Sequence, residues 1–93
     1  MKKTPAEISE FIGGEIVGNR DLLITGVCGI KEAKKGDLTF IANPKYFSLV
    51  DQTRASAIIT PRDVTVPGKS IIRTENPSLA FANVITQFIK KEF

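Results

Sequence analysis

The chain has 93 residues, of which 42% are hydrophobic and 25% charged, with one Cys and no His. A chain of this length buries roughly two-thirds of its unfolded surface, so we expect one domain over residues 1–93. Without His, the chain cannot form a Ser-His-Asp or Cys-His catalytic pair or a His-ligated metal site. Cys28 is a single cysteine and cannot form an intrachain disulfide or a thiolate cluster. We expect it to be a small buried hydrophobic side chain. We therefore expect no metal and no cofactor.

The net charge of +3 arises at the two ends of the chain, from Lys2, Lys3, Lys90, Lys91 and Glu92. Residues 4–89 carry nine basic and nine acidic side chains and are neutral as a whole. Nucleic-acid binders concentrate basic residues along one face, so this distribution predicts no nucleic-acid partner. The longest uncharged run, 76–89, is too short to span a bilayer, and no apolar segment follows the first residues. These features predict a cytoplasmic protein without a membrane span.

The N-terminal third is predicted to be a helix followed by strands. Thr4-Pro5-Ala6-Glu7 has the pattern of a capping box with Pro in the first turn, and Gly13-Gly14 supplies a stop. Between them, Ile8, Phe11 and Ile12 share one helical face. Residues 15–17 and 22–25 have strand character and are joined by turn-forming residues 18–21, so we expect a hairpin there.

The rest of the chain predicts alternating strands and helices. Residues 38–42, 57–60 and 70–73 are apolar runs typical of buried strands. Asn43-Pro44 opens a short helix to about Asp51, which predicts a right-handed crossover between the first two of these strands. Asn76-Pro77 repeats the signal and begins a final helix that we expect to reach Phe93. The fold class is therefore α/β, a small mixed sheet with flanking short helices.

The sequence contains neither of two common phosphate-binding motifs. Gly68-Lys69-Ser70 resembles the end of a phosphate-binding loop, but position 63 is Asp and strand residues follow where a helix is needed. No Gly-x-Gly-x-x-Gly fingerprint is present. The charged cluster at 31–35 is typical of a solvated turn.

The segment from Phe40 to Tyr46 is the candidate binding site. Ligands of open α/β sheets bind beyond the carboxyl ends of strands, and this segment is such an end leading into a helix. Phe40 and Tyr46 could stack on a flat base, while the Asn43 amide complements an imide edge such as that of uracil. The helix amides and Lys45 would favour an anion. The residues alone nevertheless favour packing of both rings in the core over a pocket.

Several sequence blocks, in matching order from about residue 12 to 88, carry a family resemblance. They are Ile24-Thr25-Gly26-Val27, Ile30 with Glu32-Ala33, Gly36-Asp37-Leu38-Thr39-Phe40, Ala42-Asn43-Pro44-Lys45-Tyr46, Ala55-Ser56-Ala57 and Asn76-Pro77 with Leu79-Ala80-Phe81. Together they resemble the N-terminal domain of UDP-3-O-(3-hydroxyacyl)glucosamine N-acyltransferase. The block ending at Phe40 also resembles the N-terminal UDP-binding domains of the Mur ligases, which have a similar fold.

The resemblance implies a nucleotide-recognition domain that holds the uridine of a UDP-acylglucosamine, with uracil between Phe40 and Tyr46 and Asn43 reading the base edge. The family enzyme works as a homotrimer and transfers a 3-hydroxyacyl chain from acyl carrier protein to the sugar 2-amine in lipid A synthesis. Its catalytic His lies on a left-handed β-helix that follows this domain, so we expect no catalytic residue in this chain. A Mur-ligase-like UDP-binding domain and a non-catalytic protein-interaction module remain as alternatives.

Overall fold

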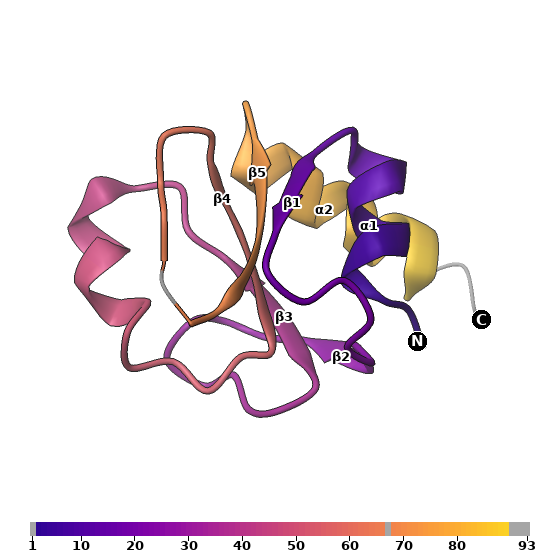
Figure 1. Ribbon diagram of the computed structural model, residues 1–93, viewed down its shortest axis with the longest axis horizontal. Coiled ribbons are helices and arrows are strands. Elements are labelled where there is room, and N and C mark those ends of the chain that lie inside the picture. Colours follow the sequence, from indigo (N-terminus) through magenta and orange to yellow (C-terminus); the bar gives the residue numbers. More distant parts are fainter. Residues whose placement is uncertain (1, 67, 90–93) are drawn as a thin grey trace.

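The structure is a computed structural model that describes residues 2–66 and 68–89. In chain order these residues form α1 (Pro5–Ile12), β1 (Glu15–Val17), β2 (Gly26–Val27), β3 (Asp37–Phe40), the 3₁₀ helix η1 (Pro44–Leu49), β4 (Ala57–Pro61), β5 (Ser70–Thr74) and α2 (Pro77–Phe88) (Figure 1). The predicted fold class, a small α/β domain with a mixed sheet and flanking helices, is confirmed.

The five strands form one sheet in the order β1-β5-β4-β3-β2. β2, β3, β4 and β5 run parallel to one another. β1 pairs antiparallel with β5 and places Ile16 opposite Ile72. β3 and β4 are therefore parallel neighbours joined through η1, as the strand-helix-strand pattern predicts. The central strands are buried on both faces, which is the reason for their continuous apolar runs.

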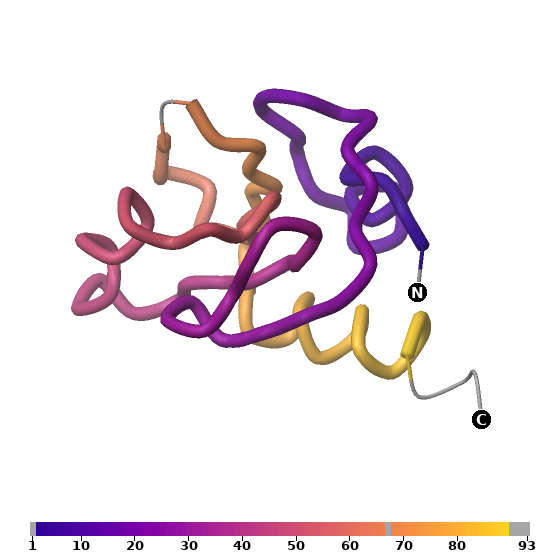
Figure 2. Tube along the Cα trace, turned by 90° about the horizontal axis from the view of Figure 1, so that it is seen from below, coloured from indigo at the N-terminus to yellow at the C-terminus, as the bar shows by residue number. Residues whose placement is uncertain are grey.

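Two layers cover the two faces of the sheet. α1 and α2 pack on one face over Leu38, Ile59 and Ile72, with Ile8 and Val84 contributed by the helices. The other face carries Ile58 and Ile71 and is covered by Ile41, Val50 and Val66. Figures 1 and 2 accordingly show η1 at the opposite end of the molecule from α1.

The helices begin where their capping signals predict. The Thr4 hydroxyl accepts from the Glu7 N–H at 3.2 Å and the Glu7 carboxylate accepts from the Thr4 N–H at 3.2 Å, which completes the capping box. Gly13 ends α1 at φ 68°, a left-handed conformation that favours glycine. Asn43 and Asn76 cap η1 and α2 through their side-chain oxygens. These short-range hydrogen bonds make the starts of the helices predictable from sequence.

The predicted hairpin between residues 15–17 and 22–25 is wrong. β1 forms where expected, but its partner is β5, and residues 22–25 form no strand beyond an isolated bridge in which Ile24 exchanges two backbone hydrogen bonds with Lys3. Of the apolar residues in that segment, Ile24 is fully buried whereas Leu23 is 56% exposed. The segment thus buries one side chain under α1 instead of building a ladder, and the next strand, β2, starts only at Gly26.

Two helices also differ in detail from the predictions. The segment after Asn43 is a 3₁₀ helix, whose turns close with hydrogen bonds such as that from the Tyr46 N–H to the Asn43 carbonyl at 2.9 Å. α2 ends at Phe88, and the part of the predicted helix at 90–93 lies outside the described residues. Within residues 2–66 and 68–89, no helix combines the length and apolar character that crossing a membrane requires.

We expect Ile59→Ala to lower the free energy of unfolding by about 2–5 kcal/mol, because the fully buried Ile59 side chain fills the core beneath α2. Leu79→Ala is the matched control, since the Leu79 side chain is 56% exposed on α2. Its effect should stay within about 0.5 kcal/mol. Urea denaturation measures both, and equal losses would contradict the assignment of the core.

Candidate functional site

A pocket of about 490 Å³ lies at the carboxyl end of β3, and we call it the strand-end pocket. It is bounded by the end of β3, the first turn of η1, the turn before β3 and the first turn of α2. Its lining residues are Ile30, Lys31, Glu32, Phe40, Ile41, Ala42, Asn43, Tyr46 and Ser78. The structure therefore brings the three predicted site residues, Phe40, Asn43 and Tyr46, to one pocket.

Phe40 belongs to both the pocket and the core. Its ring centroid lies 4.6 Å from that of Phe81 on α2, with an angle of 31° between the two planes. The half-buried ring also packs against the core cluster under the helices. The Phe40 ring therefore packs against the core and also lines the pocket. The pocket wall at Phe40 is held in place by core packing.

Tyr46 is not a core residue. Its side chain is 39% exposed on η1, and the ammonium of Lys45 lies 5.5 Å from the ring centroid. Lys45 itself does not line the strand-end pocket, and its backbone N–H is used by the Asn43 side chain. The expectation that Lys45 and the amides of this helix face an anion is therefore not met by the geometry.

The side-chain amide of Asn43 uses its oxygen in a hydrogen bond within the domain. Its Oδ1 accepts from the Lys45 N–H at 3.0 Å, and this bond caps η1. The amide nitrogen has no hydrogen-bond partner among the described residues. The cap thus orients the amide and leaves its N–H groups available to a ligand.

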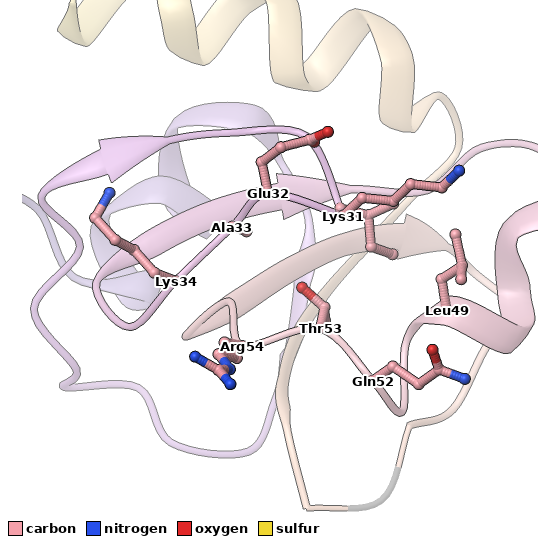
Figure 3. A pocket seen from close by; sticks show the side chains of 9 residues that line it. Lys31, Glu32, Ala33, Lys34, Leu49, Gln52, Thr53 and Arg54 are labelled. Atoms are coloured by element: carbon pink, nitrogen blue, oxygen red, sulfur yellow. The ribbon is translucent and has the colours of Figure 1, made fainter.

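A second pocket of about 580 Å³ adjoins the first and is shown in Figure 3. We call it the adjacent pocket, and it is lined by Ile30, Lys31, Glu32, Ala33, Lys34, Leu49, Gln52, Thr53 and Arg54. Ile30, Lys31 and Glu32 line both pockets. Lys31 and Glu32, in the turn predicted to be solvated, are exposed and also form a wall shared by the two pockets, which no local pattern in the sequence marked.

The motif at 68–70 has a structural role. The Lys69 ammonium donates to the Thr53 carbonyl at 2.9 Å, and the Ser70 hydroxyl donates to the Asn19 carbonyl at 2.9 Å. Both side chains tie neighbouring loops together instead of facing a phosphate. Cys28, expected to be buried, is half-buried and free.

Comparison with known proteins identifies the family. Residues 21–87 match the family described as UDP-3-O-(3-hydroxymyristoyl) glucosamine N-acyltransferase, LpxD. The chain belongs to the LpxD family. This result favours the acyltransferase resemblance over the Mur-ligase alternative.

Similar proteins named UDP-3-O-acylglucosamine N-acyltransferase extend the comparison. The protein of Syntrophus aciditrophicus (strain SB) is 40% identical over 94 residues, which cover 99% of this chain and 26% of that protein. That of Geobacter sp. (strain M21) is 44% identical over 88 residues, with 95% and 26% covered. That of Syntrophotalea carbinolica is 42% identical over 80 residues, with 86% and 23% covered. The chain therefore spans about a quarter of the length of these LpxD-family relatives.

The two aromatic residues of the strand-end pocket should differ in their effect on stability. Phe40→Ala should lower the free energy of unfolding by about 1.5–3 kcal/mol, because the ring packs on Phe81 and the core. Tyr46→Ala should change it by less than about 0.5 kcal/mol, because Tyr46 is outside both core clusters. Thermal and urea unfolding measure the pair, and a larger loss at Tyr46 would contradict the description of the pocket.

Proposed function

We propose that this domain recognises the uridine part of a UDP-3-O-acylglucosamine, with uracil between Phe40 and Tyr46 and its edge at Asn43. The observation that carries the proposal is the convergence of these three side chains on one pocket at the carboxyl end of a parallel strand. That position is where open α/β sheets bind ligands. Membership of the LpxD family supports a uridine nucleotide as the ligand, because the relatives are named for a UDP-linked substrate.

The chemistry of the pocket suits a flat, amide-like base. Stacking on an aromatic ring contributes about 1–3 kcal/mol per base. Among the described residues, the N–H groups of Asn43 have no partner and would donate to a uracil carbonyl. The Asn43 Oδ1 atom caps η1, and this bond holds the amide in place. A volume of about 490 Å³ lies within the range of small-ligand sites. Phe40 is held by Phe81, so little side-chain ordering remains for binding.

Membership of the family supports a proposal for the role of the domain within a larger activity. We propose that the complete protein moves a 3-hydroxyacyl chain from acyl carrier protein to the 2-amine of the UDP-sugar, in the cytoplasm, as a trimer in lipid A synthesis. The chain contains no His. By resemblance to the family, we place the catalytic His of this reaction on a left-handed β-helix, in the part of the relatives that this chain does not match. In this proposal the domain binds the nucleotide and positions the sugar, and it supplies binding energy remote from the reacting amine.

We expect uridine and UMP to perturb the backbone NMR signals of Phe40, Asn43 and Tyr46, and Tyr46→Ala to weaken binding by about 1–3 kcal/mol through loss of one stacking surface. Phe11→Ala is the matched control, because Phe11 is 43% exposed and contacts Phe88 instead of the pocket. Saturating nucleotide without shifts at these residues would favour the protein-interaction alternative. Equal weakening by both variants would also count against the stacking assignment.

Asn43→Asp separates base recognition from folding. The carboxylate retains an oxygen that can cap η1, so the free energy of unfolding should change by less than about 0.5 kcal/mol. The variant loses the N–H donors and sets a negative charge beside the uracil carbonyls, so uridine affinity should fall by about tenfold or more. Isothermal titration alongside urea denaturation tests this, and unchanged uridine affinity would remove Asn43 from the site.

A further inference from the structure

The wall shared by the two pockets is a turn that is anchored at both ends by apolar side chains. Ile30 packs against the core cluster beneath η1, and Ala33 is buried. The N–H groups of Glu32 and Ala33 both donate to the Gly29 carbonyl, at 3.2 and 2.9 Å. This anchoring leaves Lys31 and Glu32 exposed at the rim of the strand-end pocket.

Lys31 and Glu32 are charged side chains at this rim. In the part of the chain that the structure describes, neither side chain forms an ion pair or a side-chain hydrogen bond. Lys34, by contrast, pairs with Asp37 at 3.5 Å. Figure 3 shows Glu32 pointing toward α2 and Lys31 extending to the opposite side of the view from Lys34 and Arg54. The cations of the adjacent pocket therefore diverge, and only Lys31 is shared with the strand-end pocket.

We propose that Lys31 binds the phosphate and Glu32 binds the ribose of the nucleotide whose base occupies the strand-end pocket. This inference rests on the proposed function. A lysine ammonium binds phosphate as a point charge. An acidic side chain that accepts from ribose hydroxyls is a recurring arrangement in nucleotide-binding α/β folds. Ser78, in the first turn of the twelve-residue α2, lines the same pocket, so the positive end of this helix adds to the field of Lys31.

The position of Glu32 depends on Gly29. A Cβ atom added to Gly29 would lie 2.9 Å from the Glu32 carboxylate oxygen Oε2, which is too close for contact. The carboxylate is the far end of a flexible exposed side chain, so Gly29→Ala displaces it without disturbing the core. This substitution moves the proposed ribose contact while leaving Glu32 itself intact.

The test is a titration of the 93-residue chain with uridine, UMP and 2′-deoxyuridine, followed by NMR and calorimetry. For the unsubstituted chain we expect UMP to bind about tenfold more tightly than uridine, because its phosphate gains a charge-assisted bond. Lys31→Ala should lower the ratio of UMP affinity to uridine affinity to about one. Arg54→Ala is the matched control and should keep the ratio, because Arg54 lines only the adjacent pocket.

For the ribose contact, Glu32→Gln and Gly29→Ala should each weaken uridine binding and reduce its preference over 2′-deoxyuridine. A UMP-to-uridine ratio unaffected by Lys31→Ala, or lost equally in Arg54→Ala, overturns the phosphate assignment. A preference for ribose unaffected by Glu32→Gln overturns the ribose assignment. Failure of uridine to bind the unsubstituted chain overturns the proposed function instead, and the inference with it.

Discussion

The parallel pairing of β3 with β4 is the constraint on which the rest of the structure depends. Parallel neighbours require the chain to return from the carboxyl end of the first strand to the amino end of the second. That return begins at Asn43 with η1, so the strand-end pocket opens where the chain leaves the sheet. The same strands carry Leu38 and Ile59 toward the helices and Ile58 toward η1. Both faces must therefore be covered, and the covering layers supply the walls of the pocket.

Phe40 joins the stability of the domain to the proposed recognition of a base. Its contact with Phe81 ties the end of β3 to α2, and the same ring lines the strand-end pocket. A wall held by core packing is already ordered before a ligand arrives, which reduces the entropic cost of binding. Tyr46 stands on η1 without such support, so the two rings of the pocket differ in how firmly the fold holds them.

The distribution of charge is consistent with recognition of a small polar ligand. Residues 4–89 are neutral as a whole. Among the residues that the structure describes, the charged groups that line the strand-end pocket are the Lys31 ammonium and the Glu32 carboxylate. In the proposed arrangement, the uncharged aromatic residues receive the base and the charged turn receives the sugar and phosphate. A strongly basic surface is not needed for a single nucleotide, because one well-placed cation and a helix end suffice.

The sequence by itself determined the features that depend on near neighbours. The starts of α1, η1 and α2 were predictable because each capping bond joins residues two or three positions apart. Strands β3, β4 and β5 were predictable from apolar runs. The candidate site residues Phe40, Asn43 and Tyr46 were visible together because they lie within seven residues at one strand end. The family resemblance, not the residue pattern alone, made them candidates for a nucleotide site instead of core residues.

Only the tertiary structure decided which distant segments meet. β1 pairs with β5 across more than fifty residues, and nothing in residues 15–25 distinguishes that partner from a local hairpin. Lys31, Glu32 and Ser78 come from segments before β3 and after β5, and parallel pairing of the intervening strands brings them to one pocket. The physical reason is that long-range pairing is selected by the burial of whole faces of the sheet, which a local pattern of residues does not encode.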